Sequence, residues 1–269
     1  MKQNRGYIGH CYFKNYSLYL HMAVKLTKFK YGNIFLIETD FYITKTIIAS
    51  GQYCDEEADL FRRILQPTDN VIEVGANIGS LTIPISQMIP NGVIYAIEPQ
   101  QYVFNTLCAN LAINDLRNVK PIKLAVGDST KIVHLPIIDY DKITNFGGIE
   151  IKDGNKGEPI QQNTLDNIFY GIDKVKLLKI DVEGMEPQVL EGGFNLIRKH
   201  RPFIYCENDR GENSEKIISH LKAAGYKIHE HSSTVFNKVN FNNNEINPFD
   251  KNYICINILA VPEEVEFSL

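Results

Sequence analysis

The stretch VIEVGANIGSLT, residues 71–82, decides the fold of this chain. It begins with the apolar residues of a buried strand, carries Glu73 within that strand, and continues through Gly75 and Gly79 into an apolar segment of helical character. Glycine adopts positive φ angles and lets a ligand approach the main chain, and the start of a helix presents free N–H groups to an anionic group. The stretch therefore predicts a strand, a turn and a helix that together cradle a small molecule.

The residues of this turn indicate which molecule it binds. A nicotinamide or flavin site would show the pattern G-x-G-x-x-G, but the second and third glycine positions counted from Gly75 hold Asn77 and Ser80. The turn carries Glu73 instead, and a carboxylate there suits a ligand ammonium group better than a pyrophosphate. S-adenosylmethionine (SAM) has such an ammonium group and also a ribose, so we expect SAM as the ligand.

A second strand with an acidic end supports this expectation. Residues 93–97 form the strand, and Glu98-Pro99 follows it roughly 20 residues past the turn, the spacing at which an acid binds ribose hydroxyl groups. We expect Glu73 near the ammonium group of SAM, Gly75–Gly79 around its methionine end and Glu98 on its ribose. The alternative is that the glycines only permit a tight turn and that Glu98 caps a helix.

Length and composition fit a globular enzyme. The chain has 269 residues, of which 44% are hydrophobic, enough for one large domain or one domain with an extension. A net charge of −4 gives no broad electrostatic footprint for nucleic acid, so no nucleic acid partner is expected. No apolar run approaches the ~20 residues of a membrane span, and the N-terminus lacks a signal-peptide pattern. The five cysteines are scattered without a C-x-x-C pair and are expected to be reduced thiols of a cytoplasmic protein.

The chain divides into an extension and a main domain. Residues 1–50 are predicted to be an N-terminal β/α extension that caps the site, and residues 51–269 are predicted to be the SAM-binding domain. Segments rich in β-branched and aromatic residues predict a β-hairpin or a meander in the extension, at residues 28–31, 34–38 and 41–48. A helix from about residue 56 to residue 65 is predicted next.

From residue 71 onward, predicted strands and helices alternate. Strands are predicted at residues 71–74, 93–97, 119–126, 175–180, 202–206, 226–229 and 253–261. Helices are predicted at residues 81–88, 101–113, 164–170, 187–190 and 214–224. Residues 131–163 interrupt the alternation with short extended pieces and polar turns. This order is typical of an α/β fold, a parallel sheet with helices on both faces.

A second chemical cluster occupies residues 177–193, LLKIDVEGMEPQVLEGG. Its strand ends at Asp181, and ligands of open α/β sheets bind outside the carboxyl ends of the strands, so Asp181 is expected to point at the same crevice as the two acids above. Lys179 shares a strand face with Asp181, and a buried lysine needs a partner, which Asp181 or Glu183 is expected to provide. The alternative is that the acids of this segment, Glu186 included, only favour the positive end of the following helix.

Together these motifs resemble FkbM-type methyltransferases. The resemblance covers residues 51–207 and is carried by GQY at 51–53 with the acidic helix start at 56–57, E-x-G-A-N-I-G at 73–79, I-E-P at 97–99, A-V-G-D at 125–128 and, most specifically, K-I-D-V-E-G-x-E at 179–186. It implies a class I, Rossmann-like fold with a seven-stranded, mostly parallel sheet whose last strand is antiparallel. It also implies SAM as methyl donor and mostly O-methylation of sugars or secondary metabolites, although N-methylating members exist. Many members carry aspartate in place of Glu73, a change that keeps the charge.

The resemblance and the residues together give the predicted SAM-binding set. The A-V-G-D turn is expected to flank the adenine. The predicted cofactor-binding residues are Glu73, Gly75, Ala76, Asn77, Gly79, Glu98, Pro99, Val126, Gly127, Asp128 and Asp181.

The predicted function is SAM-dependent O-methylation of a hydroxyl group on a sugar, a glycan or a secondary metabolite. A neutral alcohol is a poor nucleophile near pH 7 and needs a base, a metal or tight alignment. We expect Asp181 and Glu183 to position and deprotonate the acceptor, and Lys179 to fix Asp181. The alternatives are N-methylation of a peptide amide or amine, a nucleotide-sugar enzyme on the same sheet, and a non-catalytic SAM-binding module.

A divalent metal is a further hypothesis. The strand at residues 202–206 ends in Glu207-Asn208. Metal-dependent catechol-type methyltransferases place oxygen ligands after the fourth and fifth strands, and Asp181, Glu207 and Asn208 resemble that arrangement. All three are oxygen donors suited to Mg²⁺ or Ca²⁺. The alternative is that Glu207 and Asn208 only bind the acceptor or the Lys179 ammonium group.

The last long connection is a candidate wall of the acceptor pocket. Residues 231–252 are long for a link between two neighbouring strands, where about 2–5 residues is usual. The segment mixes aromatic residues with many asparagines, which suits a sugar-like acceptor. The alternatives are a mobile surface loop without a role, and a wall formed by the N-terminal segment at residues 28–48.

Overall fold

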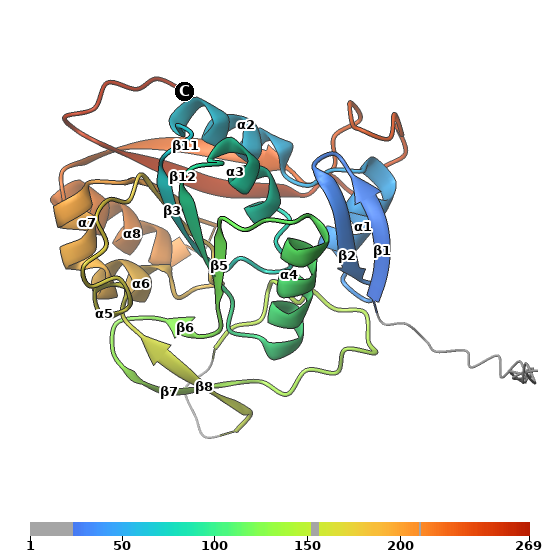
Figure 1. The fold of residues 1–269 in the computed structure, drawn as a ribbon, viewed down its shortest axis with the longest axis horizontal. Helices are drawn as coiled ribbons and strands as arrows, with labels where there is room; N and C mark the ends of the chain where they lie inside the picture. Colours follow the sequence, from blue (N-terminus) through green and yellow to red (C-terminus); the bar gives the residue numbers. More distant parts are fainter. Residues whose placement is uncertain (1–23, 152–155, 210) are drawn as a thin grey trace, which may run out of the picture.

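A seven-stranded sheet forms the centre of the protein, seen here in a computed structural model that describes residues 24–151, 156–209 and 211–269 (Figure 1). In spatial order its strands are β11 (Tyr226–Thr234), β12 (Ile254–Pro262), β10 (Phe203–Glu207), β9 (Leu177–Ile180), β3 (Asn70–Val74), β4 (Val93–Ile97) and β5 (Val119–Ile122). The pairs from β10 to β5 are parallel, and the last strand, β12, is antiparallel to both of its neighbours. The predicted Rossmann-like sheet with an antiparallel last strand is confirmed.

Helices cover both faces of this sheet because successive strand residues point to opposite sides. Val71, Leu177 and Phe203 pack on one face beneath α2 (Asp55–Ile64), α3 (Thr82–Met88) and α4 (Gln101–Ile113). The residues that follow them in the chain, Ile72, Leu178 and Ile204, pack on the other face. The helices of that face are α5 (Leu165–Ile168), α6 (Glu186–Gly192), α7 (Phe194–His200) and α8 (Gly211–Ala223). None of the helices among the described residues is long and apolar enough to span a membrane.

The strand predicted at residues 119–126 is two strands, so that prediction was wrong in its extent. Ile122 is the last residue of β5 and pairs with Ile97, the last residue of β4, so the ladder has no partner beyond this point. The chain then forms β6 (Ala125–Val126), which joins a small separate sheet with β8 (Glu158–Asn163) and β7 (Lys131–Leu135). The interruption at residues 131–163 is therefore largely this second sheet.

In its described residues, 24–50, the N-terminal extension contains the predicted hairpin but no meander. Strands β1 (Val24–Phe29) and β2 (Gly32–Ile37) pair antiparallel, whereas the segment at residues 41–48 lies mostly in a helix, α1 (Ile43–Ser50). The Asp40 carboxylate accepts a hydrogen bond from the Thr44 backbone N–H at 3.1 Å and so holds the start of this helix. Burial of Ile43 and Ile47, four residues apart on one helix face, outweighs the strand propensity of this segment. Residues 1–23 of the predicted extension lie outside the described residues.

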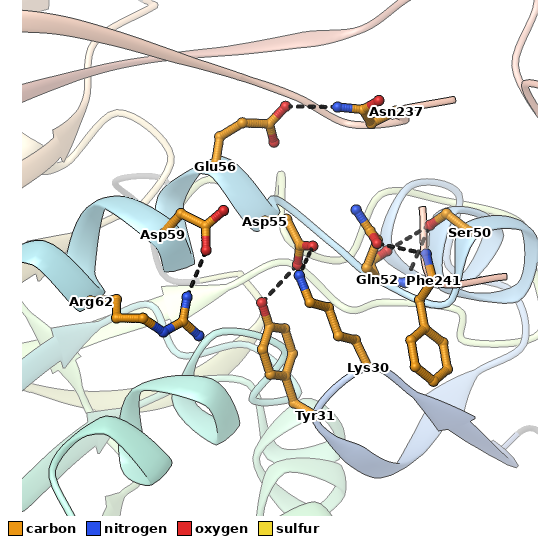
Figure 2. A network of polar contacts seen from close by, with 10 residues as sticks. All are labelled: Lys30, Tyr31, Ser50, Gln52, Asp55, Glu56, Asp59, Arg62, Asn237 and Phe241. Atoms are coloured by element: carbon orange, nitrogen blue, oxygen red, sulfur yellow. Dashed lines mark hydrogen bonds and ion pairs between the residues drawn. The ribbon is translucent and has the colours of Figure 1, made fainter. Parts of the chain in front are cut away.

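The first turn of α2 ties the N-terminal hairpin to the C-terminal part of the chain (Figure 2). Asp55 accepts hydrogen bonds from the Lys30 ammonium group at 2.6 Å and the Tyr31 hydroxyl at 2.9 Å. Its neighbour Glu56 accepts bonds from the side chains of Thr234 and Asn237, at 2.7 and 3.5 Å. The turn between β1 and β2 and the end of β11 with its following connection are thus fixed to the same helix.

The asparagine-rich connection between β11 and β12 is anchored to α1. The Asn242 backbone N–H donates to the Ser50 carbonyl at 3.0 Å, and the Asn244 side-chain amide donates to the Ala49 carbonyl at 3.1 Å. The last carbonyls of a helix lack partners within the helix, so these asparagines supply the C-terminal cap of α1. The many asparagines therefore have a structural role.

Candidate active site

A cavity of about 440 Å³ opens at the carboxyl ends of the parallel strands. Because β12 is antiparallel, its first residues reach the same edge, and the cavity runs from the end of β4 to the start of β12. Lys179 is a basic residue of its lining. Among the described residues, seven carboxylic acids also line it: Glu57, Glu73, Glu98, Asp181, Glu183, Glu207 and Asp209. The structure thus brings five of the acids singled out in the sequence around one cavity: Glu73, Glu98, Asp181, Glu183 and Glu207.

The glycine turn allows β3 and β9 to approach each other at the cavity floor. Gly75 has a φ of 86°, and a Cβ atom there would lie 1.8 Å from the Asp181 carbonyl oxygen. Any side chain would therefore push the two strand ends apart. Asn77 has a φ of 49°, which points its backbone N–H at the Glu98 carboxylate, 3.1 Å away. Gly79, with a φ of 88°, completes the turn before α3.

Glu98 is held rigidly at the edge of the cavity. Its carboxylate accepts backbone hydrogen bonds from Asn77 at 3.1 Å and from Gln100 at 2.8 Å, one on each oxygen, and the residue is only 4% exposed. Burial raises the pKa of this carboxyl to about 7, although both backbone bonds act against the rise. Sequence reasoning missed Gln100, a buried residue that lines the same cavity, and its place directly after Glu98-Pro99 was the available signal.

A small apolar pocket of about 50 Å³ adjoins Glu98. Its lining includes Pro99, Val126 and Ile149, so Val126 lies where a residue flanking the adenine is expected. Gly127 instead packs against the Gln162 side chain, and Asp128 accepts a hydrogen bond from Ser129 at 2.7 Å. Gly127 and Asp128 are therefore placed to shape the turn behind this pocket.

Lys179 is a buried cation surrounded by acids. Its side chain is 3% exposed and donates a hydrogen bond to Asp181 at 3.0 Å, while the Asp181 side chain remains 44% exposed toward the cavity. Burial alone would lower the pKa of Lys179, but the carboxylates of Asp181, Glu73 and Glu57 outweigh burial and raise it. Asp181 is therefore fixed by a permanent positive charge.

Two further acids face Lys179. Glu73 is 1% exposed and accepts a hydrogen bond from the Thr82 hydroxyl at 2.6 Å. Glu57, to which the sequence assigned no role in the site, accepts bonds from Ser233 at 2.9 Å and from Asn257 at 3.3 Å. Burial raises the pKa of each carboxyl to about 7, and the Lys179 charge limits the rise. The signal for Glu57 was its place on the apolar face of an amphipathic helix, beside Ala58 and Phe61.

The loop after β9 presents a second acidic group of residues. One carboxylate oxygen each from Asp181, Glu183 and Glu207 lie within 4.8 Å of one another. Burial and the charges of Asp181 and Glu183 raise the pKa of Glu207 to about 10. The Glu186 carboxylate accepts backbone hydrogen bonds from Val182 and Gly184, at 3.0 to 3.2 Å. Glu186 therefore stabilises the loop.

The far end of the cavity is apolar and aromatic. Tyr42 and Tyr53 come from the segment around α1, and Val235 and Tyr253 come from the connection between β11 and β12. Val235 packs in one cluster with Phe236 and Phe249, against which Tyr42, Tyr53 and Tyr253 lie. The two candidate walls considered from the sequence are thus parts of a single wall.

Comparison with known proteins matches this chain to one family. Residues 73–228, more than half of the chain, match the Methyltransferase FkbM domain. Methyltransferase sdnD of Sordaria araneosa is 26% identical over 153 residues, covering 45% of this chain and 59% of that protein. Methyltransferase 1 of Beauveria bassiana is 26% identical over 149 residues, covering 47% of this chain and 59% of that protein. A tRNA(Phe) (4-demethylwyosine(37)-C(7)) aminocarboxypropyltransferase of Methanocaldococcus jannaschii is 30% identical over 93 residues, 35% of each protein.

Solved structures share the fold. Methyltransferase FkbM from Methylobacillus flagellatus superimposes with a TM-score of 0.50 at 16% identity, covering 72% of this chain and 44% of that one. Trm5b from Pyrococcus abyssi superimposes with a TM-score of 0.50 at 12% identity, covering 90% of this chain and 57% of that one. The chain thus aligns with only part of each of these proteins. The family match and the sheet with its acidic cavity establish that the chain belongs to the FkbM methyltransferases, a family of SAM-dependent enzymes.

Proposed function

We propose that this chain transfers the methyl group of SAM to a hydroxyl group on a sugar, a glycan or a secondary metabolite. The observation that carries the proposal is the position of Asp181, which is fixed by the buried Lys179 and exposed to the cavity. In the sheet, Asp181 follows β9, between the Glu98 end at β4 and the aromatic wall at β12. A base at this point lies between a cofactor half and an acceptor half of the cavity.

The residues at the Glu98 end fit SAM. The cavity volume lies within the range of about 300–1,000 Å³ that is usual for small-molecule sites. Glu98 offers two carboxylate oxygens to the ribose, the Gly75 turn brings the main chain to the methionine end, and Val126 with Pro99 lines an apolar pocket for the adenine. The Glu73 carboxylate attracts the ammonium group of SAM, although the same carboxylate also interacts with the charge of Lys179. When bound, SAM supplies an electrophilic methyl group.

The opposite end supports a small, uncharged acceptor. Aromatic rings from both walls offer faces for a sugar ring or a similar scaffold. The carboxylates of Asp181 and Glu183 repel phosphate groups, so nucleic acid is disfavoured as an acceptor. These acids would also receive an amine, and N-methylation of an amine or amide is therefore the second candidate function. Asp181 and Glu183 are placed to accept a proton from an acceptor. This placement argues against the alternative that the chain binds SAM without catalysing a reaction.

Mass spectrometry of metabolites tests the proposal. Extracts of a strain that lacks the gene are compared with those of the parent strain. We expect one compound to lose the mass of one methyl group and to regain it when the purified protein and SAM are added. Fragmentation then places the methyl group on oxygen or on nitrogen. An unchanged set of compounds together with no SAM binding would reject the enzymatic function.

The acidic group after β9 gives this mechanism a metal-dependent variant. Glu183 joins Asp181 and Glu207 within 4.8 Å, and the buried side-chain oxygen of Asn208 has no hydrogen-bond partner among the described residues. Such oxygen donors would hold Mg²⁺ or Ca²⁺ and orient the acceptor oxygen. In this variant we expect exhaustive EDTA treatment to abolish methyl transfer, and added Mg²⁺ to restore it. Full activity after EDTA would reject the metal and leave Asp181 as the base.

Shortening the connection between β11 and β12 tests the acceptor wall. We expect replacement of residues 237–247 by a Gly-Ser turn to raise the KM for the acceptor roughly tenfold, because the aromatic wall loses its anchor on α1 and the acceptor is misplaced. SAM affinity should not change. Enzyme kinetics and calorimetry make the comparison, with Asn105→Ala, at an exposed position of α4, as a control. An unchanged KM and kcat would mean that the connection is only a surface loop.

The extension and the location of the protein are parts of the same proposal. We propose that residues 1–50 cap the site, since Ile43 of α1 and the neighbouring Tyr42 line the cavity. A cytoplasmic location agrees with the free state of the four cysteines among the described residues.

A further inference from the structure

Two cysteines meet at the acceptor end of the cavity. Cys54 caps the start of α2 and Cys255 lies in β12, about 200 residues further along the chain. Their sulfur atoms lie within 4.8 Å of each other, and a carboxylate oxygen of Glu57 lies within the same distance of both. Both line the cavity, beside Glu57 and Tyr53.

The two thiols differ in access. Cys54 is 4% exposed, whereas Cys255 is half-buried and borders the open cavity. A small oxidant in the cavity therefore meets the more exposed Cys255 first, with the Cys54 sulfur within 4.8 Å of it. An accessible cysteine next to a second cysteine that resolves its oxidised form is the arrangement of redox-sensitive pairs.

We propose that Cys54 and Cys255 form a reversible disulfide when a hydroperoxide enters the cavity. The Cys255 thiolate attacks the peroxide oxygen, the O–O bond breaks, and the sulfur becomes a sulfenic acid as water or an alcohol leaves. The Cys54 sulfur then attacks the sulfenic sulfur, and hydroxide leaves with the Cys54 proton as water. Two thiols and one hydrogen peroxide thus give one disulfide and two water molecules. A dithiol reductant reverses the reaction.

The disulfide alters the acceptor end and leaves the cofactor end in place. It shortens the distance between the sulfurs to about 2.05 Å, which draws the start of β12, with Tyr253 nearby, against α2. The Glu98 end lies four strand spacings away across β10, β9 and β3, about 19 Å at ~4.8 Å per strand. The effect on methyl transfer rests on the proposed function, but formation of the disulfide does not.

Treatment of the full-length protein with hydrogen peroxide tests the inference. We expect the intact mass to fall by two hydrogen atoms, two thiols to disappear in a titration, and peptide mapping to join the peptides of Cys54 and Cys255. Dithiothreitol should restore both thiols. The cross-link should raise the Tm by roughly 5–10 °C, and SAM affinity measured by calorimetry should stay within about twofold.

Matched variants make the test specific. The control Cys108→Ser, on α4 and outside the cavity lining, should still form the link. Cys255→Ser should keep Cys54 as a free thiol, and Cys54→Ser should leave Cys255 to over-oxidise to sulfinic acid. Sulfinic acid at Cys255 in the unaltered protein, or a link between another pair such as one with Cys11, would overturn the proposal. A protein that forms the link but binds no SAM in either redox state would contradict the proposed function and not the disulfide.

Discussion

Asp181→Asn should lower kcat by roughly 10²–10⁴-fold, the usual effect of losing a general base. The amide keeps the shape of the side chain but neither takes a proton from the acceptor hydroxyl nor balances the Lys179 charge. Asp181 is well placed for this role because Lys179 holds it at 3.0 Å while part of its carboxylate faces the cavity. Initial-rate kinetics with the acceptor identified from extracts measure the change.

Two controls separate catalysis from folding in this variant. SAM affinity should persist, since the ribose and adenine contacts lie at the Glu98 end. The thermal unfolding curve should show a native fold, because Glu73 and Glu57 still offset the Lys179 charge. Glu183→Gln is the companion variant, and a larger loss of kcat there would assign the base to Glu183. A near-normal kcat in both would mean that alignment alone carries the reaction.

Glu98→Ala should weaken SAM binding by about 1.5–3 kcal/mol, the cost of removing charge-assisted hydrogen bonds to the ribose. We expect a large loss because the Glu98 carboxylate is held in one position by two backbone N–H groups. In the alanine variant no other side chain takes the place of this carboxylate at the ribose. Isothermal titration calorimetry measures the affinity. Asp115→Asn, at an exposed ion pair with Arg117, serves as the control and should bind SAM normally.

The same carboxyl predicts a pH dependence. Because burial raises the pKa of Glu98 to about 7 in the free protein, the group gains a proton as the pH falls through 7. Hydroxyl donors of the ribose need the ionised form, so SAM affinity should be complete above pH 7 and fall below it, by at most about tenfold per pH unit for this one proton. Glu98→Gln should remove the share of Glu98 and leave the smaller share of Glu73, whose carboxyl also has a pKa raised to about 7 by burial. An identical pH profile in the variant, or unchanged affinity in Glu98→Ala, would reject Glu98 as the ribose ligand.

Local sequence patterns were sufficient for the regular elements around the cofactor turn. The strand at residues 93–97 and the helix at residues 101–113 have the predicted bounds. Their signals are short-range, an apolar run with an acidic end and apolar positions at helical spacing, so neighbouring residues specify them. The same local signals place Glu73, Glu98 and Asp181 in or directly after predicted strands, and the rule that ligands bind at the carboxyl ends of parallel strands predicted one shared edge.

The remaining features depend on residues that are distant in the sequence. The segment of α1 has strand propensity but forms a helix because one helix face is buried. Residues 119–126 form two strands and not one because their partner, β4, ends at Ile97. Glu57 joined the site only because α2 packs beside Lys179, and Gly75 is required by the Asp181 carbonyl of another strand.

The contact of Cys54 with Cys255 has the same origin. Neighbouring residues fix dihedral angles and periodicity. Packing of the sheet, the helices and the two ends of the chain fixes which side chains meet.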